Sequence, residues 1–359
     1  MYRRRRLLGV TAAAAAILMG GLAACSSGGT GTSNATGTAA SSNMPTVTMM
    51  VGGLDKQIYL PYQLAQGLGY YRKYGVNMQL STQETGGVAA ETAMVSGQVD
   101  MAGTWYVGAI DLQSSGKQVE NIVQLSGAPG ENEMCATGTK ITSPAQWRGQ
   151  ALGVTSIGSG TDDLTLYLAA RYGLTSKDFT VVAAGDGDTM IAAIQHHRIA
   201  CGMTTQPTVA AIENQSVGYS AFDLSTSAGV QKWLGGTWPS AGVLARTSWI
   251  NSNRATVQKV VDALVATMHW IATHSAAQIA AHLPSDFVSS SLSSSAQYIQ
   301  ALTAEKSQFL PNGMMPAGGP QAVLATEKEA GRLSGPVNLS ATYTNSFAIN
   351  ANKLEGFSS

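Results

Sequence analysis

Apolar residues recur at two different spacings along the chain after about residue 45. A short apolar run closed by glycines predicts a buried strand over residues 46–53, and alternation of apolar and polar residues predicts a second strand over 76–83. A third strand is expected over 99–104. Helices are predicted between these strands, over 60–75 and, between glycines, over 88–96. This alternation of strand and helix is typical of a parallel sheet with helices packed on its faces.

A second set of elements begins near residue 130 and repeats the alternation. From residue 248 onward the pattern is mostly helical, most clearly over 253–274. The sequence therefore predicts two α/β units followed by helices that pack against them. The second set comprises strands over 134–137, 151–155, 179–185 and 199–205, with helices from 161 and over 188–198.

Three glycines mark the first predicted helix. Gly67 and Gly69 lie inside it, where each costs about 1 kcal/mol relative to alanine. Because glycine lets a helix approach its neighbour closely, we expect both to be points of close packing between this helix and the sheet. Gly75 is expected to end the helix as a C-terminal cap.

The first 25 residues have the layout of an export signal. A basic start at Arg3–Arg6 is followed by an apolar stretch too short to span a membrane, and then by small residues. Residues 22–25 resemble a bacterial lipoprotein cleavage site, which would leave Cys25 as a lipid-modified N-terminus. Residues 4–8 also resemble a twin-arginine export pattern, so the export route stays open. We expect a signal peptide over 1–24 and a flexible Gly/Ser/Thr-rich tether over 25–44.

Charge and composition exclude several classes of protein. Without the four arginines of the leader, 17 basic residues face 21 acidic ones, and no basic patch suggests nucleic-acid binding. No later run of about 20 apolar residues could span a membrane. The remaining length is enough for two domains with large cores. We therefore expect an exported protein that a lipid on Cys25, its N-terminus after cleavage, holds at the outer face of the cell membrane.

Five segments, taken in order, carry a resemblance to a known family. Together they resemble the substrate-binding proteins of the nitrate/sulfonate/taurine-type ABC importers, a group that also includes binders of thiamine precursors. The resemblance extends from about residue 46 to about residue 347. The segments are LPYQLAQGLGYYRKYGVNMQL, SGQVDMAGT, ITSPAQWRGQALGVTSIGSGT, PNGMMP and ATYTNSF.

This resemblance implies an α/β, two-lobe fold of the periplasmic-binding-protein type (type II). Each lobe would hold a parallel-dominated sheet flanked by helices, and the chain would cross twice at a hinge. Lobe one would cover 45–130 plus 247–359, and lobe two 131–246. The implied function is a monomeric, non-enzymatic receptor that closes on a small solute and delivers it to an ABC permease and its ATPase. A secreted enzyme on the same fold is the alternative.

Turns between strands and helices supply the first candidates for a binding site. In open parallel sheets, ligands lie beyond the carboxyl ends of the strands, where helix N-termini offer free N–H groups. Small residues there let a ligand reach the backbone, and serine or threonine adds hydroxyl donors. Each candidate could equally be a plain turn with a helix cap. These candidates are Gly53, Gly86, Thr104, Ser156, Ser159, Thr161 and Asp186.

Aromatic side chains supply the second group of candidates, since small-molecule pockets are mostly apolar. Four of them lie near predicted turns or the expected crossover, and burial in the core is the alternative for each. Gln206, which follows the last strand of the second unit, completes the ligand-binding set. The aromatic candidates are Tyr59, Trp105, Tyr106 and Trp238.

Catalytic and metal chemistry find little support in the sequence. It contains no GxSxG, HExxH, GxGxxG or phosphate-loop lysine motif. Ser156 and Ser159 could be nucleophiles, but no base with an orienting partner accompanies them. Asp162 and Asp163 are acids of the kind expected in the first turn of a helix. Neither a cofactor nor a metal is therefore expected.

Besides Cys25, the chain contains two cysteines. Cys135 and Cys201 would lie in an oxidising compartment and could form a disulfide. Two separate buried thiols are the slightly favoured alternative.

Two opposing signals bear on the charge of the ligand. Helix N-termini suit nitrate, sulfonates and related anions, which are the better-known ligands of the resembled family. The turns expected to line the cleft, however, carry five acids with Lys56 as the obvious counterweight, and an anion beside them would be repelled. Because Trp105 and Tyr106 could stack on a flat ring, a neutral or cationic heterocycle is favoured over an organic sulfonate. The five acids are Asp55, Asp162, Asp163, Asp186 and Asp188.

Overall fold

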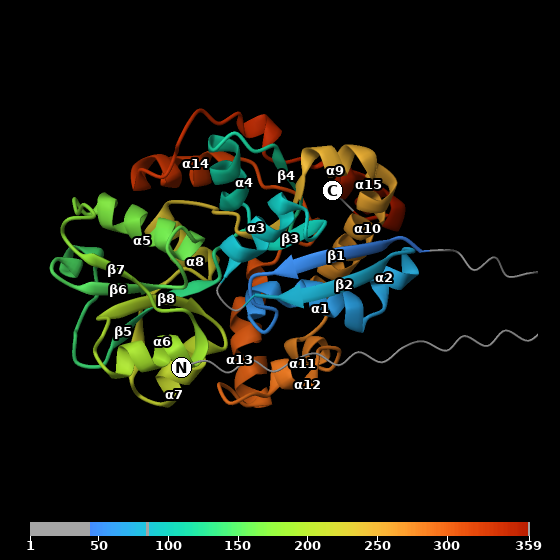
Figure 1. Ribbon diagram of the computed structural model, residues 1–359. Helices are drawn as coiled ribbons and strands as arrows, with labels where there is room; N and C mark the ends of the chain where they lie inside the picture. The colour runs from blue at the N-terminus through green and yellow to red at the C-terminus, as the bar shows by residue number, and fades with distance from the viewer. Residues whose placement is uncertain (1–43, 84–85, 358–359) are drawn as a thin grey trace, which may run out of the picture. The chain divides into compact units, whose positions relative to one another are not determined.

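The computed structural model describes residues 44–83 and 86–357, and every structural statement below refers to these residues. The expected leader, nearly all of the tether, and Cys25 lie outside them. The described segments form one unit, which contains two five-stranded sheets (Figure 1). Each sheet is the centre of one lobe, so the predicted two-lobe α/β fold is confirmed.

The sheet of lobe one has the strand order β2-β1-β3-β10-β4. β1 runs parallel to β2 and β3, as the strand–helix alternation predicts, whereas β10 runs antiparallel to β3 and β4. β3 is buried along its whole length, and β1 alternates between buried and more exposed positions; Met49, Val51 and Met101 are fully buried. The strands are β1 (Thr46–Val51), β2 (Asn77–Thr82), β3 (Met101–Trp105), β4 (Val119–Gln124) and β10 (Ala241–Arg246).

The sheet of lobe two repeats this plan with the order β7-β6-β8-β5-β9. β6 is parallel to β7 and β8, and β5 is antiparallel to β8 and β9. Both sheets are thus mixed, since two of the four pairings in each are antiparallel. The strands are β5 (Glu131–Ala136), β6 (Ala151–Val154), β7 (Thr180–Ala183), β8 (Cys201–Thr205) and β9 (Gly218–Asp223).

Helices cover both sheets. α14 lies above α5 of lobe two in Figure 1, and it contacts both α5 and α4 of lobe one. Lobe two carries η2 (Pro144–Trp147), α5 (Gly160–Arg171), α6 (Gly187–Gln195), α7 (Thr208–Asn214) and α8 (Ser227–Leu234). The first part of lobe one carries η1 (Gln57–Tyr59), α1 (Leu60–Gly67), α2 (Tyr70–Lys73), α3 (Gly87–Ser96) and α4 (Val107–Ser114). The C-terminal part adds α9 (Thr247–Ser252), α10 (Arg254–Thr273), α11 (Ala276–Ala280), α12 (Ser285–Val288), α13 (Ser295–Glu305), η3 (Lys306–Gln308), α14 (Gly319–Ala330), η4 (Leu339–Ala341) and α15 (Ser346–Glu355).

The chain crosses between the sheets twice, through residues 125–130 and 224–240. The two crossovers are hydrogen-bonded to each other: the hydroxyls of Ser126 and Ser240 are 2.7 Å apart, and Ser240 donates to the carbonyl of Ala128 at 2.6 Å. The second crossover ends before β10, so residues 241–246 belong to the sheet of lobe one and not to lobe two as expected. The pattern of apolar residues predicts no strand there, and the family resemblance alone placed these residues in lobe two.

The first predicted helix is two helices, because Gly69 adopts a left-handed conformation (φ 71°) between α1 and α2. Gly67 is a point of close packing, but its contact is not the sheet. A Cβ there would lie 2.0 Å from the carbonyl oxygen of His282. Gly75 has a positive φ just after α2, as a C-terminal glycine should. The expected packing of both glycines on the sheet is therefore wrong.

A disulfide joins two neighbouring strands of lobe two. Cys135 on β5 faces Cys201 on β8, with their Cα atoms 3.9 Å apart and both side chains buried. The favoured alternative of two separate thiols is therefore wrong. The strand pattern predicted both strands but not that they are neighbours across 66 residues of chain.

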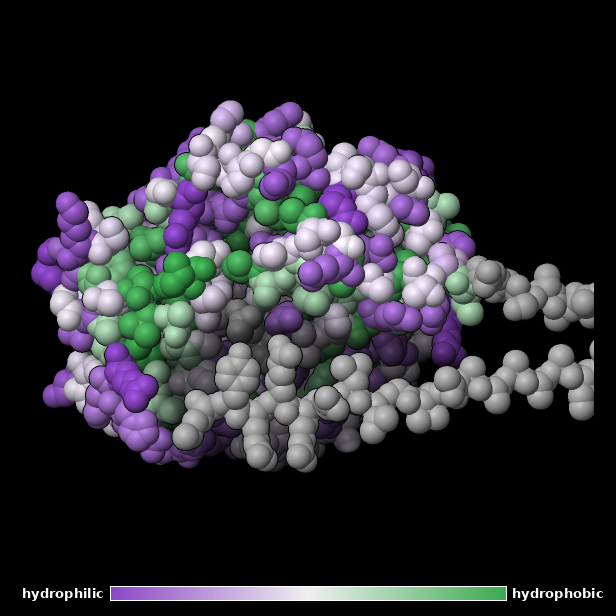
Figure 2. Space-filling view, viewed as in Figure 1, coloured by the Kyte–Doolittle hydropathy of each residue, from purple (hydrophilic) through white to green (hydrophobic). Residues whose placement is uncertain are grey.

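The surface in Figure 2 is hydrophilic at both ends of lobe two, and hydrophobic residues gather over its β6–β7 edge. Val181 and Val182 of the edge strand are only half-buried. None of the helices in the described ranges combines the length and the hydropathy needed to cross a bilayer.

Candidate functional site

A cavity lies between the lobes at the carboxyl ends of β1, β3 and β6. About 500 Å³ of empty space lies inside its walls when the open solvent at its mouth is included. The N-termini of α3 and α5 reach its wall from opposite lobes. Its wall consists of Gly52, Lys56, Ile58, Tyr59, Gly86, Gly87, Val88, Glu91, Thr104, Trp105, Val107, Gly108, Asp111, Glu131, Thr155, Gly158, Ser159, Gly160 and Thr161.

The structure brings half of the twelve predicted ligand-binding residues to this wall. That they contact a ligand stays a prediction. Those on the wall are Tyr59, Gly86, Thr104, Trp105, Ser159 and Thr161, and those outside it are Gly53, Tyr106, Ser156, Asp186, Gln206 and Trp238.

The sequence suggested that Thr104 and Trp105 lie in a turn. They are instead the last two residues of β3. Trp238 lies behind Trp105, with the two rings 5.6 Å apart at 74°. The indole N–H of Trp238 donates to the Thr326 hydroxyl of α14 at 2.9 Å. Trp238 therefore supports the wall without forming it.

Tyr106 points away from the cavity into lobe one. Its hydroxyl is hydrogen-bonded to that of Thr342 at 2.5 Å, and its ring meets Tyr343 edge to face. Because the chain turns from β3 into α4 at this residue, its side chain faces the opposite side from Trp105. Of the two residues expected to stack on a ring, only Trp105 therefore lies on the wall. Tyr59 of η1 is the second aromatic side chain there.

Hydroxyl groups line the wall where β6 leads into α5. The hydroxyl of Ser159 donates to the carbonyl of Ser156 at 2.7 Å and lies 2.8 Å from that of Thr161. Thr155 adds a third hydroxyl, 3.0 Å from both Ser159 and Thr161. These partners are a carbonyl and other hydroxyls, none of which is a base that could activate a serine. The arrangement offers hydrogen bonds to a ligand and no nucleophile.

Glu91 of α3 is a wall residue that the sequence analysis missed. It accepts a hydrogen bond from the Thr104 hydroxyl at 2.8 Å. Burial raises the pKa of Glu91 to about 7, the bond from Thr104 lowers it, and the charge of Asp111 raises it further. Small neighbours make room for this carboxylate, since a Cβ on Gly108 would lie 2.3 Å from its Oε1. Glu91 lies one turn into its helix, so a search for turns could not find it.

Glu131, the first residue of β5, is the second acidic residue missed on the wall. It is 4% exposed, and its Oε2 atom accepts no hydrogen bond from a described donor. Burial raises the pKa of Glu131 well above its ordinary value, and Lys56 partly offsets this. A strand that begins at the cleft carries no glycine or turn signal, which explains why the sequence analysis missed this residue.

The charge of Lys56 is already compensated. Its Nζ donates to the carbonyl of Gly52 at 2.9 Å and forms an ion pair with Asp186 of lobe two. Gly53 permits this folded-back position, because a Cβ there would lie 2.7 Å from the Cε of Lys56. Gly53 and Asp186 thus act on the lysine rather than on the cavity.

Other contacts also join the lobes across the cleft. The backbone N–H of Gln57 donates to the carbonyl of Gln206 at 3.1 Å, and the side chain of Gln206 reaches Glu305. A Cβ on Gly160 would lie 2.1 Å from the ring of Trp105. The structure therefore describes a closed cleft, in which residues of both lobes are in contact.

Comparison with known proteins agrees with this geometry. The model of the "NMT1/THI5 like" family matches residues 58–277. The chain belongs to the NMT1/THI5-like family. No curated protein matches its sequence.

Solved structures show that this NMT1/THI5-like chain shares its two-lobe fold with proteins of low sequence identity. A protein from Bordetella bronchiseptica RB50 is 24% identical, with a TM-score of 0.79 over 87% of this chain and 98% of its own. The periplasmic nitrate-binding protein NrtA from Synechocystis PCC 6803 is 14% identical, with a TM-score of 0.69 over 87% and 89%. The alkanesulfonate-binding protein SsuA from Xanthomonas axonopodis pv. citri, bound to MOPS, is 14% identical, with a TM-score of 0.62 over 83% and 98%. The resemblance drawn from the sequence is confirmed.

Proposed function

We propose that this protein is the extracytoplasmic solute-binding component of an ABC importer. It captures a small molecule by closing its two lobes and delivers it to a membrane permease and its ATPase. Membership of the NMT1/THI5-like family and a cavity between two lobes support this proposal. Structural neighbours whose names state nitrate or alkanesulfonate binding support it further. A lipid on Cys25 holds the protein at the outer face of the membrane.

The ligand we propose is a neutral or cationic heterocycle. The observation that carries this choice is the charge of the wall, where Glu91, Asp111 and Glu131 face one lysine that Asp186 already neutralises. Burial raises the pKa of all three acids. A bound anion would raise it further, whereas a bound cation stabilises their charged forms, so the wall favours a cation over an anion. A cation or an amino group would instead satisfy the unpaired Oε2 of Glu131.

The wall also suits a flat ring. Trp105 and Tyr59 supply aromatic surface, and the hydroxyls at the start of α5 can donate to ring nitrogens. An aminopyrimidine of the thiamine-precursor kind combines a flat ring, ring nitrogens that accept and amino groups that donate. The five aspartates named in the sequence analysis support this choice less than the three acids that line the cavity. Of them, Asp186 pairs with Lys56, Asp188 is exposed, and Asp162 pairs with Arg332.

Calorimetric titration with four probes tests the proposal: taurine, ethanesulfonate, 4-amino-2-methylpyrimidine and thiamine. We expect micromolar or tighter binding of at least one of the two pyrimidine compounds and none of either sulfonate. Tight sulfonate binding without pyrimidine binding would refute the ligand class and leave the importer role intact. Mass spectrometry of the released ligand tests the enzymatic alternative, which a chemically altered ligand would support.

Charge-removing variants locate the binding energy. Glu131→Gln and Glu91→Gln should each weaken binding of a cationic probe about tenfold or more, because hydrogen bonds to charged groups contribute about 1.5–3 kcal/mol. Glu133→Gln is the matched control, since Glu133 is equally buried in β5 but does not border the cavity. Because the pKa of Glu91 is about 7, binding of thiamine should tighten as the pH rises through 7. A pH-independent affinity would show that Glu91 does not contact the cation.

A further inference from the structure

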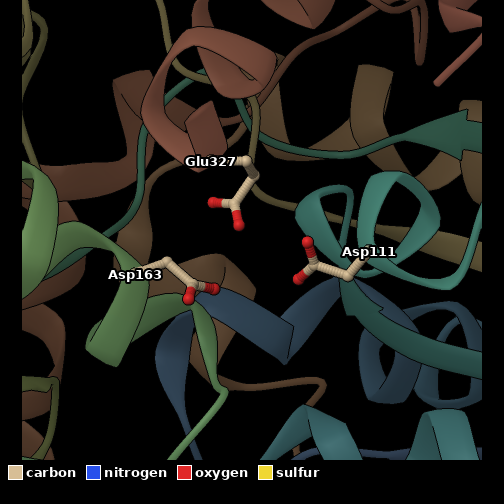
Figure 3. Close-up of side chains that lie close together, drawn as sticks. All are labelled: Asp111, Asp163 and Glu327. Carbon is tan, nitrogen blue, oxygen red and sulfur yellow. The ribbon is translucent and has the colours of Figure 1, made fainter. Parts of the chain in front are cut away.

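Three carboxylates converge at one edge of the cleft, outside the set of residues that the sequence analysis singled out for binding. Asp111 lies on α4 of lobe one, Asp163 on α5 of lobe two, and Glu327 on α14. One oxygen of each lies within 4.8 Å of the others. Figure 3 shows the three side chains pointing toward a shared space from three directions. Acids on one solvated surface would spread apart, so this convergence needs an explanation.

Burial increases the free-energy cost of bringing these carboxylates together. Glu327 is fully buried, and no described N–H or O–H group donates to either of its carboxylate oxygens. A buried carboxylate without a donor or cation is expensive, and proteins rarely keep one. The unpartnered Glu327 therefore points to a positive ligand in the space that it faces.

One protein cation lies beside the cluster, and it is shared. Arg332 forms ion pairs with Asp162 and, at 2.8 Å from Nε to Oδ1, with Asp163. Four carboxylates thus surround one guanidinium, and no ion pair of Arg332 with Asp111 or Glu327 is seen among the described residues. One guanidinium therefore does not compensate the charge of all four acids.

We propose that Asp111, Asp163 and Glu327 bind a divalent cation of the calcium class. The ligand atoms are all carboxylate oxygens, which hard cations prefer, whereas zinc favours nitrogen and sulfur. Two oxygens that share a calcium ion at about 2.3–2.6 Å can lie up to about 5 Å apart. Magnesium, at about 2.1 Å, requires separations below about 4.2 Å. Because all three oxygens lie within 4.8 Å of one another, one calcium ion can contact all of them.

The remaining ligands of the ion come from water. Calcium takes about six to eight oxygens, and three carboxylates supply three to six. Asp111 also borders the cavity and is only half-buried, so one side of the cluster is open to solvent. No sequence motif indicates this site, because its three acids come from three helices that are far apart in the chain.

The proposed ion joins lobe one, lobe two and α14, and so it stabilises the closed cleft. It does not rest on the proposed solute, because the three carboxylates come together without one. It can therefore be tested in protein free of any organic ligand, and its failure would leave the importer proposal untouched.

The experiment uses the complete chain stripped of metal with EDTA and then dialysed. Calcium, manganese and magnesium are added separately, and binding is followed by thermal shift and by calorimetry. We expect calcium to raise the Tm and to bind with a stoichiometry of one. Glu327→Gln and Asp111→Asn should each weaken calcium binding at least tenfold, and Glu133→Gln should leave it unchanged. Circular dichroism checks that each variant is folded.

Two results would overturn the proposal. One is an unchanged Tm and no binding heat for the unmodified chain at millimolar concentrations of all three cations, which would mean that protons alone neutralise the cluster. The other is unaltered calcium affinity in both Glu327→Gln and Asp111→Asn, which would place any bound ion elsewhere. Terbium luminescence excited through tryptophan gives an independent measure of occupancy, and calcium should displace terbium from the unmodified chain.

Discussion

Replacing Gly160 with alanine tests whether the closed cleft depends on a contact between the lobes. The new Cβ would lie 2.1 Å from Cε3 and 2.5 Å from Cζ3 of Trp105. Non-bonded carbon atoms prefer about 3.5–4.0 Å, so one side must retreat by about 1.5 Å. Trp238 packs behind Trp105, which limits movement of the indole within lobe one. The lobes themselves are therefore expected to stay further apart.

The energetic cost falls on the closed state alone, because the two residues belong to different lobes. Overpacking of this kind typically costs about 1–3 kcal/mol. Since 1.4 kcal/mol is a factor of ten, ligand affinity should fall about 5- to 150-fold. The open protein should not suffer, because alanine is a better helix former than glycine at the start of α5.

Two measurements check this prediction. Calorimetry gives the affinity, and small-angle scattering at saturating ligand gives the radius of gyration, which should stay larger in Gly160→Ala than in the unmodified chain. A Trp105→Leu background serves as the control, because Gly160→Ala should cost little once the indole is gone. Equal affinity and equal compaction in Gly160→Ala and the unmodified chain would refute the closed contact.

Three further predictions concern stability and anchoring. Replacing Cys135 and Cys201 by alanine opens a loop of 66 residues. Urea unfolding should show that the free energy of unfolding falls by up to about 4 kcal/mol. An unchanged midpoint would contradict a stabilising disulfide. Burial raises the pKa of Glu305 to about 8 from 4.5, with Gln206 lowering it and Asp223 raising it. The folded state therefore holds a proton that the unfolded state releases, and stability should fall as the pH rises from about 4.5 to about 8, by up to about 1.4 kcal/mol per pH unit. Glu305→Gln should flatten this slope in urea titrations, and an identical slope would assign it to other groups. Cys25→Ser should move the protein from the membrane to the soluble fraction on cell fractionation, and an unchanged membrane fraction would rule out a lipid at this residue.

The strand–helix alternation predicted the local elements well and their partners poorly. Strand and helix periodicity depends on which face of an element is buried, and this is a local property of the sequence. Which strand lies beside which is decided by contacts between distant segments. For this reason the pairing of Cys135 with Cys201 was left open, and β10, where the pattern predicts no strand, was placed in lobe two by the family resemblance alone. The break at Gly69 went unnoticed because glycine inside an apolar stretch is compatible with either packing or a turn.

The candidate site was predictable to the extent that it follows the rule for open sheets. Turns at strand ends led to Gly86, Ser159 and Thr161, which do border the cavity. Glu91 and Glu131 were missed because one lies within a helix and the other begins a strand. Both are candidates for binding a cation because they are buried and because the wall's lysine is already paired with Asp186. Burial and pairing of this kind depend on the folded structure and cannot be inferred from the sequence.

Closing this cleft requires positive charge between the lobes, because acidic residues of both lobes meet there. Closure brings Asp186 of lobe two to Asp55 and Lys56 of lobe one, and it brings Asp163 to Asp111 and Glu327. Without compensation, each meeting would place like charges together in a region of low dielectric constant, which opposes closure. Lys56 and Arg332 compensate part of this charge, and on both proposals made above a cationic solute and a metal ion supply the rest. The two ligands would then favour the same closed state, so calcium should tighten binding of the solute by the same factor by which the solute tightens binding of calcium.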